Sequence, residues 1–435
     1  MKFKKYESYK DAEIDWLDEI PCNWEIKRVK DLLINNIYGT SQNTYDEGKI
    51  EILGMGDIQD GKINFPKEKF VDQIVNELLL KKGDILYTRT NGSISLIGKA
   101  GLIEDEVVNV SFASYLVRLR FRKSENSKFY NYLFNSESYR NKARSISIST
   151  AQNNLSSAKY VQVLLPTMDL KQKCEIVNYL DEKTQKIDKE ISILEQKIEK
   201  YKELKQTLIS ETVLRGLDKN VELQECNSKW IGDIPKHWNT NRLKNIFKER
   251  VGKNLDIKTG EAVTSNILSV MKDIGVINHR DKGNVGNKMA EDITNYKLVY
   301  PNDIVVNKMN VMIGSVGISK EFGALSVVYI ILITKKDSYA KYYDYFFRMK
   351  AFQRSLRRIA TGILEIREAV NMTLFMQETM TKPPYDEQVK IANYLDEKTS
   401  KIDSIIEVIG KKIEVLKEFR KTLINDVVTG KVKVA

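Results

Sequence analysis

Two long stretches of the chain carry apolar residues at alternating steps of four and three, the spacing of a helix that packs along one seam. Glutamate and lysine flank both seams, and each seam is interrupted once by a basic residue, Lys205 in the first and Arg420 in the second. A seam that continues through several heptads favours a coiled coil over an ordinary surface helix. The predicted core positions are Ile187, Ile191, Leu194, Ile198, Tyr201, Leu208, Ile402, Ile406, Ile409, Ile413, Leu416 and Leu423.

The same two stretches are near-copies of each other. NYLDEKTQKIDKEI starts at Asn178 and NYLDEKTSKIDSII starts at Asn393, an offset of 215 residues, and eleven of the fourteen positions match. A similar offset relates IPCNW, from Ile20, to IPKHW, from Ile234. Because the matching segments keep the same order in both halves, we predict an internal duplication. Two homologous halves related by a pseudo-two-fold axis would run their long helices antiparallel.

The segments outside the long helices show strand patterns. Short runs such as KINF from Lys62, DILYT from Asp84 and DIVVN from Asp303 are separated by glycine and asparagine turns. The longest apolar run, ALSVVYIILI at 324–333, is about half the length needed to cross a bilayer, and we expect it to form one buried strand. These patterns are typical of a domain of mixed α/β structure.

Each of these domains is expected to contain one aromatic and basic helix. The two sequences are FYNYLFNSESYRNKARSI from Phe129 and YYDYFFRMKAFQRSLRRI from Tyr342. The aromatic side chains lie at helical spacing and are predicted to be core, while the basic face is either a phosphate contact or a solvated surface.

The predicted fold class is therefore α/β (α+β), with two homologous domains separated by two long helices that form an antiparallel coiled coil. The predicted boundaries are 1–170 for the first domain, 171–217 for the central helix, 218–386 for the second domain and 387–435 for the C-terminal helix. At 435 residues the chain is long enough for each domain to bury its own core.

The net charge and the cysteine content exclude few classes of function. The net charge is +11, with 26 basic and 19 acidic residues at 218–386 against 24 and 23 at 1–170. A polyanionic partner and a solvated lysine surface explain this excess equally well. Cys22, Cys174 and Cys226 form no disulfide or zinc pattern, suit a reducing cytoplasm and are each expected to be buried. The N-terminus has no apolar signal segment after its lysines, so neither secretion nor membrane insertion is expected.

No catalytic or metal-binding pattern is present in the sequence. The two histidines, His237 and His279, have no ligand-spaced partners, and neither a Walker loop nor a GxGxxG motif occurs. KPPYD at 382–386 is interpreted as a proline turn that leads into the second long helix. We therefore expect no catalytic residue, no metal and no cofactor on this chain.

The duplicated order of these motifs resembles the DNA specificity subunit of a Type I restriction-modification system. The likeness lies in IPCNW and IPKHW, in the GDIL and NDIV strands, and in PPYDEQVKIANYLDEKTSKID with its earlier counterpart. The resemblance implies a cytoplasmic, non-catalytic subunit with two target recognition domains, which reads a split, asymmetric site in double-stranded DNA. It further implies two methyltransferase subunits that use S-adenosylmethionine to methylate adenine, and restriction subunits that use ATP and magnesium.

Arginine, asparagine, glutamine and serine in equivalent loops of both domains are the side-chain types that read base edges. A non-catalytic coiled-coil scaffold that binds protein partners explains the heptads and the duplication equally well, but does not explain these loops. The predicted DNA-binding residues are Arg89, Asn91, Ser93, Lys99, Arg144, Gln152 and Asn153 in the first domain, and Lys308, Asn310, Arg357, Arg358 and Arg367 in the second.

Overall fold

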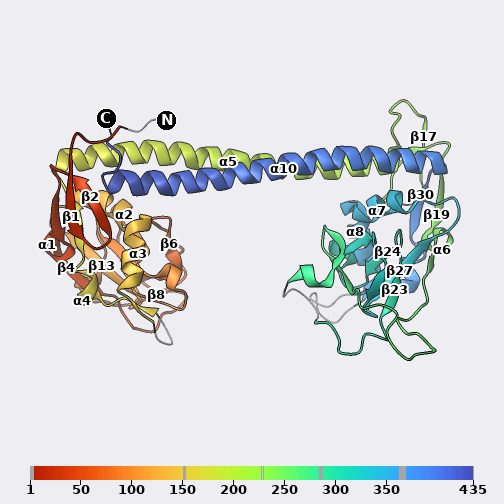
Figure 1. Cartoon of the computed structure of the whole chain (residues 1–435), viewed down its shortest axis with the longest axis horizontal. Coiled ribbons are helices and arrows are strands. Elements are labelled where there is room, and N and C mark those ends of the chain that lie inside the picture. The colour runs from red at the N-terminus through yellow and green to blue at the C-terminus, as the bar shows by residue number, and fades with distance from the viewer. Residues whose placement is uncertain are drawn as a thin grey trace. The chain divides into compact units, whose positions relative to one another are not determined.

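The computed structural model describes residues 4–149, 153–226, 228, 230–283, 288–361 and 369–434. The chain divides into two compact units, one formed by Met1–Glu195 with Lys411–Ala435 and the other by Gln196–Gly410. Both divisions fall inside the long helices α5 (Leu170–Arg215) and α10 (Tyr385–Val428). Each unit therefore contains one α/β domain and a part of both long helices (Figure 1).

A mixed sheet forms the centre of the first unit. Its order is β4-β13-β9-β11-β7-β6, and the β11–β7 pair is parallel whereas the other pairs are antiparallel. The strands β9 and β13 are buried along almost their whole length, which agrees with their continuous apolar sequences. The bounds are β4 Leu33–Tyr38, β13 Leu116–Phe121, β9 Ile85–Thr88, β11 Ala100–Leu102, β7 Lys62–Ile63 and β6 Ile58–Gln59.

The second unit repeats the first four strands of this sheet in the same spatial order. Its sheet is β20-β27-β24-β25, with every neighbouring pair antiparallel. The bounds are β20 Phe247–Glu249, β27 Tyr329–Thr334, β24 Ile304–Asn307 and β25 Val316–Ile318. The duplication seen in the sequence is therefore a duplication of topology, and the predicted mixed α/β fold class is confirmed.

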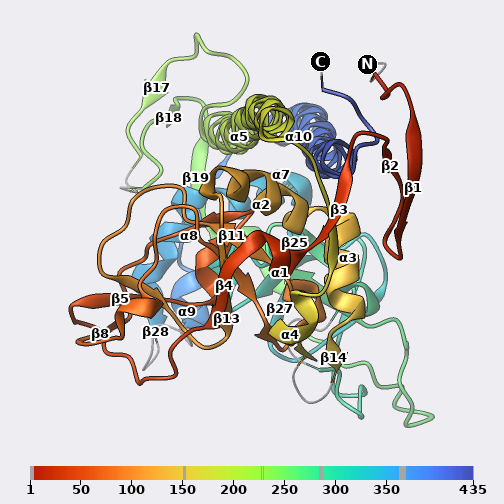
Figure 2. The same cartoon turned by 90° about the vertical axis from the view of Figure 1, so that its left-hand side faces the viewer.

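Smaller elements complete the two units, and those of the first unit surround its sheet in Figure 2. In the first unit they are β1 Tyr9–Ile14, β2 Leu17–Pro21, β3 Glu25–Arg28, α1 Val29–Leu32, β5 Ile50–Leu53, β8 Phe70–Val71, β10 Thr90–Asn91, β12 Val110–Phe112, α2 Ser127–Asn135, α3 Glu137–Ser145, β14 Ile148–Ser149, β15 Asn153–Asn154, α4 Ser157–Tyr160 and β16 Leu164–Thr167. In the second unit they are β17 Leu223–Gln224, β18 Ile234–Pro235, β19 Asn239–Arg242, α6 Leu243–Ile246, β21 Leu268–Met271, β22 Gly275–Asn278, β23 Lys297–Val299, β26 Gly323–Leu325, α7 Ala340–Arg348, α8 Lys350–Ser355, β28 Ala360–Thr361, β29 Ala369–Val370, α9 Met372–Phe375 and β30 Thr379–Lys382.

Three predicted elements are wrong because each is broken into two. The run at 324–333 forms β26 and β27, since β26 pairs with β23 while β27 pairs with β20 and β24. The predicted aromatic helices are the pairs α2–α3 and α7–α8, because Ser136 and Met349 adopt extended backbone angles (ψ 151° and 127°) between them. The turn lets both helices of a pair direct aromatic side chains into one core, and the predicted core role of these aromatics is confirmed. The fully buried examples include Phe129, Tyr130, Phe134, Tyr139, Tyr342, Tyr343, Phe346, Phe347 and Phe352.

The prediction of buried cysteines is also wrong. Cys22 and Cys174 are exposed, and Cys226 is half-buried. Cys174 lies in the first turn of α5, next to the buried Lys173 and two residues before the buried Ile176, so its side chain occupies the outer face of the helix.

The long helices run antiparallel in each unit, as their ion pairs show. In the first unit Asp188 pairs with Arg420 at 2.8 Å and Glu190 pairs with Lys412 at 2.7 Å. In the second unit Lys205 pairs with Asp403 at 2.7 Å. Asp403 and Arg420 lie 215 residues after Asp188 and Lys205, so the two units contain the same ion pair. The basic residues that interrupt the apolar seams are therefore the partners of aspartates on the facing helix.

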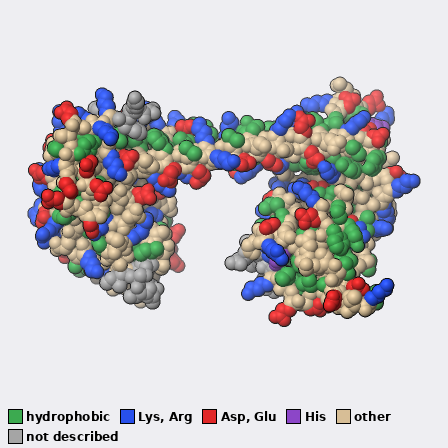
Figure 3. Space-filling view, viewed as in Figure 1, with side chains coloured by type: hydrophobic (Ala, Val, Ile, Leu, Met, Phe, Trp, Pro, Cys, Tyr) green, Lys and Arg blue, Asp and Glu red, His purple; other side chains and the backbone are tan. Residues whose placement is uncertain are grey.

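The predicted seam residues are all buried or half-buried. Ile187, Ile402, Ile409, Ile413 and Leu423 are buried. Charged side chains of both signs cover the outer faces of the helices (Figure 3). The half-buried seam residues are Ile191, Leu194, Ile198, Tyr201, Leu208, Ile406 and Leu416.

The duplicated sequence NYLDEKT is explained by a contact between the domain and its long helix. In the first unit the carboxylate of Asp181 accepts a hydrogen bond from the Tyr132 hydroxyl at 2.8 Å and pairs with Lys128 at 2.8 Å. The Tyr132 hydroxyl also lies 3.5 Å from the Thr184 hydroxyl. We call these four residues the first clasp. Leu180, which precedes Asp181 in the motif, is fully buried in the domain core.

The second unit builds an identical arrangement, the second clasp, from Tyr345, Lys341, Asp396 and Thr399. Tyr345 donates to Asp396 at 2.8 Å, Lys341 pairs with Asp396 at 3.0 Å, and the two hydroxyls lie 3.2 Å apart. Burial and the neighbouring aspartate raise the pKa of both clasp tyrosines, so the hydroxyls remain protonated donors at neutral pH.

Removing the clasp hydroxyl should loosen the domain from its helix. We expect Tyr132→Phe and Tyr345→Phe each to lower the free energy of unfolding of its own unit by about 1–2 kcal/mol, the range for a hydrogen bond to a charged group that remains partly exposed. Hydrogen–deuterium exchange of the full chain measures the effect in each unit. The matched controls are Tyr179→Phe and Tyr394→Phe, in the same motif, whose rings lie beside Lys183 and Lys398. Equal changes in the controls would contradict a specific role for the clasp.

One lysine is buried at the first domain–helix junction and has a glutamine counterpart in the second. Lys173 is 5% exposed, and its ammonium lies 3.2 Å from the Asn126 side-chain oxygen and 5.2 Å from the centre of the Tyr130 ring. Burial, with Lys27 and Lys123 nearby, lowers its pKa from 10.5 to about 8. At the equivalent position Gln388 is fully buried, donates to the Pro383 carbonyl and accepts from the Tyr339 amide.

This lysine should make stability depend on pH. Because the pKa of Lys173 is lower in the folded chain than in the unfolded chain, unfolding takes up a proton between about pH 8 and pH 10.5. The free energy of unfolding should therefore rise with pH as the pH passes through about 8. We expect Lys173→Gln to be more stable than the parent at pH 7 and to lack most of this rise between about pH 8 and pH 10.5, measured by urea unfolding. The control is Lys171→Gln, at an exposed position, and parallel pH profiles for all three proteins would contradict the prediction.

Candidate nucleic-acid interface

The loop that follows β9 is closed at its base by backbone hydrogen bonds. The Thr88 amide donates to the Lys99 carbonyl, and the Gly98 amide donates to the Thr88 carbonyl, both at 2.8 Å. Gly98 has a left-handed backbone (φ +74°), and a Cβ atom at this position would lie 2.8 Å from the Cβ of Ala143 on α3. Glycine is therefore required where the loop packs on α3. The loop presents Arg89, Asn91 and Ser93 between its two closed ends.

The equivalent loop of the second unit follows β24 and is closed in a similar way. The Asn307 amide donates to the Ser315 carbonyl at 3.1 Å, so Ser315 occupies the position of Lys99. Gly314 adopts a left-handed backbone (φ +98°) next to Asp273, as Gly98 does next to Ala143. Asn310 is exposed and precedes the single turn of 3-10 helix in this loop.

A second segment packs against each loop at the same point. In the first unit the Leu155 amide donates to the Arg89 carbonyl at 2.7 Å, and β10 pairs with β15. In the second unit the amide of Val370, the last residue of β29, donates to the Lys308 carbonyl at 2.9 Å, and β29 pairs with β28. The structure thus brings together loop residues and turn residues that are far apart in the sequence. Arg89 and Lys308 occupy equivalent positions in this arrangement.

Arg89 is held by weak contacts beside the exposed ring of Tyr38. Its guanidinium carbon lies 4.9 Å from the centre of the Tyr38 ring, and its terminal nitrogens lie 3.3 Å from the Asn154 side-chain oxygen and 3.5 Å from the Ser114 carbonyl. Tyr38 and Tyr115 are 46% and 52% exposed. A guanidinium oriented in this way can exchange its long hydrogen bonds for a base edge or a phosphate. The sequence did not indicate these contacts. The Tyr38 ring reaches the guanidinium through the order of the sheet, and the Tyr115 carbonyl accepts from the Arg89 amide at 3.0 Å.

Several other predicted residues can be placed from the described part of the chain. Asn91 accepts a hydrogen bond from the Ser93 amide at 2.9 Å, and the Ser93 hydroxyl lies 2.8 Å from that of Ser95. Asn153 pairs through its backbone with Asn91. Gln152 and Arg367 lie outside the described residues.

The basic face of the aromatic helices is not equivalent in the two units. In the first unit Arg144 donates to the Asn141 side-chain oxygen at 2.9 Å, and Arg140 donates to the Ser95 carbonyl in the loop at 2.5 Å. In the second unit Arg357 is exposed, whereas Arg358 forms an ion pair with the buried carboxylate of Glu378. Arg358 therefore has a structural partner that the sequence did not reveal.

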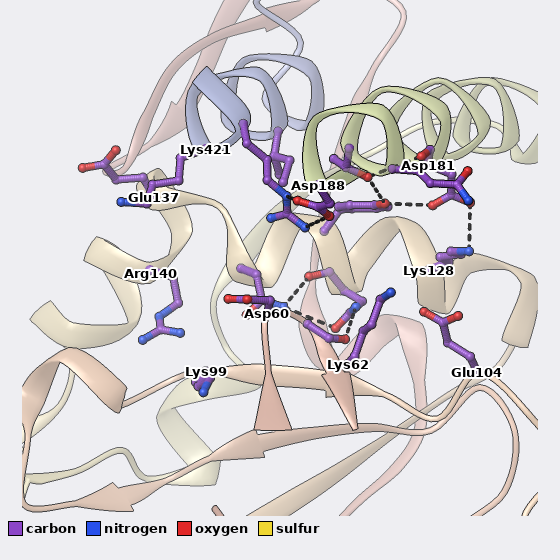
Figure 4. Close-up of a pocket in the computed structure, with 18 of the residues that line it drawn as sticks. Asp60, Lys62, Lys99, Glu104, Lys128, Glu137, Arg140, Asp181, Asp188 and Lys421 are labelled. Atoms are coloured by element: carbon purple, nitrogen blue, oxygen red, sulfur yellow. Dashed lines mark hydrogen bonds and ion pairs between the residues drawn. The ribbon is translucent and has the colours of Figure 1, made fainter. Parts of the chain in front are cut away.

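The first unit contains a charged pocket of about 720 Å³ (Figure 4). Its walls come from the β6–β7 hairpin, from α2 and α3, and from the long helices. Three of its cations have acidic partners in Lys128–Asp181, Arg420–Asp188 and Lys421–Glu418. The side chains labelled in Figure 4 are Asp60, Lys62, Lys99, Glu104, Lys128, Glu137, Arg140, Asp181, Asp188 and Lys421.

The described residues offer neither a metal-binding cluster nor a membrane-spanning helix. These residues contain no group of three or more histidine, cysteine, aspartate or glutamate side chains that could hold a metal ion. The His237 ring and the Trp238 indole both contact the carboxylate of Glu387, each at 2.8 Å, which gives this histidine a partner at the start of α10. None of the described helices is both long and apolar enough to cross a membrane.

The sequence is similar to specificity subunits along its whole length. It is 24% identical to the putative type I restriction enzyme MjaX specificity subunit of Methanocaldococcus jannaschii, with 100% of this chain and 99% of that protein aligned. It is 21% identical to the MjaVIII specificity subunit of the same organism, with 100% and 98% aligned. A shorter match of 28% identity to the type I restriction enzyme EcoKI specificity subunit of Escherichia coli covers 30% of this chain and 29% of that protein.

Solved structures support the same fold. A chain from a study of complex assembly and conformational transition of the type I R-M system matches with a TM-score of 0.69 at 14% identity, covering 94% of this chain and 98% of that chain. The HsdS subunit from Thermoanaerobacter tengcongensis matches with a TM-score of 0.54 at 14% identity, covering 95% and 98%. Residues 21–200 also match the model of the family described as Type I restriction modification DNA specificity domain. In its duplicated domains, its antiparallel helices and these matches, the chain is similar to type I restriction-modification specificity subunits, and residues 21–200 match their DNA specificity domain.

Proposed function

We propose that this specificity subunit reads a bipartite, asymmetric target in double-stranded DNA, with one half-site for each α/β domain. The observation that carries the proposal is the equivalence of the two loop sites, in which Arg89 with Leu155 and Lys308 with Val370 share one backbone arrangement. Two copies of one framework that present different side chains suit two different half-sites. The loop side chains are arginine, lysine, asparagine and serine, which donate to and accept from base edges.

We further propose that the chain has no catalytic step of its own. The loops offer hydrogen-bonding and cationic groups, which position and distinguish DNA, and the exposed arginines and lysines add contacts to phosphates. Adenine methylation would be carried out by two methyltransferase subunits that bind S-adenosylmethionine. Cleavage would be carried out by restriction and translocase subunits that use ATP and magnesium.

The alternative of a protein-binding scaffold makes a different prediction for the purified chain. A DNA reader should bind the correct duplex more tightly than a scrambled one, and its affinity should fall steeply with salt because bound phosphates release counterions. A scaffold should show neither preference nor a steep salt dependence.

Exchanging one domain tests independent reading of the half-sites. We expect replacement of residues 1–170 by the equivalent domain of a related specificity subunit to change one half of the methylated motif and to leave the other half intact. The readout is methylome sequencing of a host that carries the chimaera with its methyltransferase. The matched control exchanges 218–386 and should change the opposite half. A change of both halves in either chimaera would contradict the proposal.

Replacing Arg89 tests the first loop directly. If its guanidinium reads a base, Arg89→Ala should cost about 1–3 kcal/mol of binding free energy on the cognate duplex and relax the preference at one position. If it contacts only a phosphate, the loss should be smaller and independent of sequence. Binding isotherms on cognate and substituted duplexes distinguish these results. Arg122→Ala, at an exposed position after β13, is the control, and an unchanged affinity and salt dependence for Arg89→Ala would remove this residue from the interface.

A further inference from the structure

The charges of the pocket in the first unit are not evenly balanced. Toward the long helices, Lys128, Arg420 and Lys421 are each neutralised by an acidic partner. At the other end of the pocket, Lys99 and Arg140 lie together (Figure 4). Lys99 belongs to the loop that follows β9, which we call the recognition loop, and Arg140 belongs to α3. Arg144 lies one helical turn further along α3. We call Lys99, Arg140 and Arg144 the cationic cradle.

The cradle has unsatisfied hydrogen-bonding capacity. None of its three side chains lies within 4.0 Å of a carboxylate oxygen among the residues that the structure describes. The buried Nε atoms of Arg140 and Arg144 likewise have no hydrogen-bond partner in the described part of the chain. The carboxylate of Asp60 acts on Lys99 without forming an ion pair with it, and Glu104 and Glu137 also line the pocket. Buried cationic donors without partners are costly unless an anion satisfies them.

The pKa shifts of the cradle side chains agree with cations that are partly buried and lack a carboxylate partner. Burial, together with the neighbouring Arg144, lowers the pKa of Arg140 to about 10, and burial also lowers the pKa of Lys99. The Arg140 guanidinium therefore remains charged at neutral pH. The protein keeps this charge although its surroundings disfavour it.

The second domain shows that the fold does not need the cradle. The position of Lys99 is taken by Ser315, whose carbonyl accepts from β24 as that of Lys99 accepts from β9. Counting from the breaks at Ser136 and Met349, the position of Arg140 is taken by Gln353, which is 2% exposed and donates to the Phe347 carbonyl at 3.0 Å.

The surrounding positions of the second domain are also closed by internal partners. Asp344 and Arg348 form an ion pair at 2.9 Å where the first domain has Asn131 and Asn135. The second domain thus has neutral side chains at the positions of Lys99 and Arg140, while the position of Arg144 is taken by the exposed Arg357. Because the second domain folds without counterparts of Lys99 and Arg140, the stability of the fold does not explain why the first domain has these two cations.

We propose that Lys99, Arg140 and Arg144 bind one phosphate group of the DNA backbone, and that only the first domain holds DNA in this way. The inference rests on the proposed DNA-reading function. Arginine side chains present several N–H donors in a planar fork that suits the oxygens of a phosphate. The cradle is continuous with the recognition loop, because Lys99 closes the base of that loop and Arg140 donates to Ser95 within it. A phosphate bound there would fix the loop while Arg89 and Asn91 contact the bases.

The test replaces the cradle by the residues of the second domain. The variant is Lys99→Ser with Arg140→Gln in the full chain, which introduces side chains that the homologous position already accommodates. Losing one phosphate contact should reduce the magnitude of the slope of log affinity against log salt by about 0.9. If parent and variant bind equally at about 1 M salt, the variant should then bind about fivefold more weakly than the parent at about 0.15 M salt. The recognised sequence should not change. Lys421→Gln, on another wall of the same pocket, removes one charge and serves as the control that keeps the parent slope.

A neutral backbone substitution identifies the phosphate. Methylphosphonates placed one at a time along the first half-site should reveal one position that weakens binding of the parent protein and has no effect on the double variant. An unchanged salt slope, or equal sensitivity of parent and variant at every position, would overturn the inference. If the double variant does not fold, Lys99→Ser alone is tested in the same two assays and is judged by the same criteria.

Two further outcomes separate the inference from the proposed function. If the parent chain shows no sequence-selective, salt-dependent binding, the DNA-reading function itself fails. Inorganic phosphate is then added at constant ionic strength. If phosphate raises the unfolding temperature of the parent and not of the variant, the cradle binds a free phosphate and the assignment to DNA is overturned.

Discussion

In each unit an equivalent carboxylate, Asp181 or Asp396, connects the α/β domain to its long helix. Each receives a tyrosine hydroxyl and a lysine ammonium from the first helix that follows the sheet. The neighbouring leucine of the motif enters the domain core, so polar and apolar contacts fix the same turn of helix. The loops that follow β9 and β24 are attached to the sheet that these helices cover. Their orientation relative to the adjoining part of the long helix therefore depends on the two clasps.

The long helices were predictable because their signal is local and periodic. The heptad positions of α5 and α10 determine which face is buried, and no distant information is needed. The interruptions at Lys205 and Arg420 were visible in the sequence, but their meaning was not. They pair with Asp403 and Asp188, and this match requires the antiparallel register of the two helices.

The fold class of the domains was predictable from the sequence, whereas the breaks and the pairing of individual strands and helices were less so. A continuous apolar run gives no indication that β26 and β27 join different sheets, since burial on both sides looks the same in either case. Serine at position 136 does not predict a helix break, because the helix propensity of serine is intermediate. The loop site was indicated by residue type, yet its assembly depends on distant partners. Lys99 and Arg140 meet because Gly98 packs on Ala143, a contact that neither segment encodes alone.

The separation between the clasps and the loops has a consequence for how such a protein can vary. The clasp residues belong to α2, α7 and the two NYLDEKT motifs, whereas Arg89, Asn91, Lys308 and Asn310 belong to loops at strand ends. Changes in the loops therefore leave the attachment of the domain intact and do not reduce its stability through that junction. Substitutions in these loops can therefore change the side chains that one domain presents and need no compensating substitution in the scaffold.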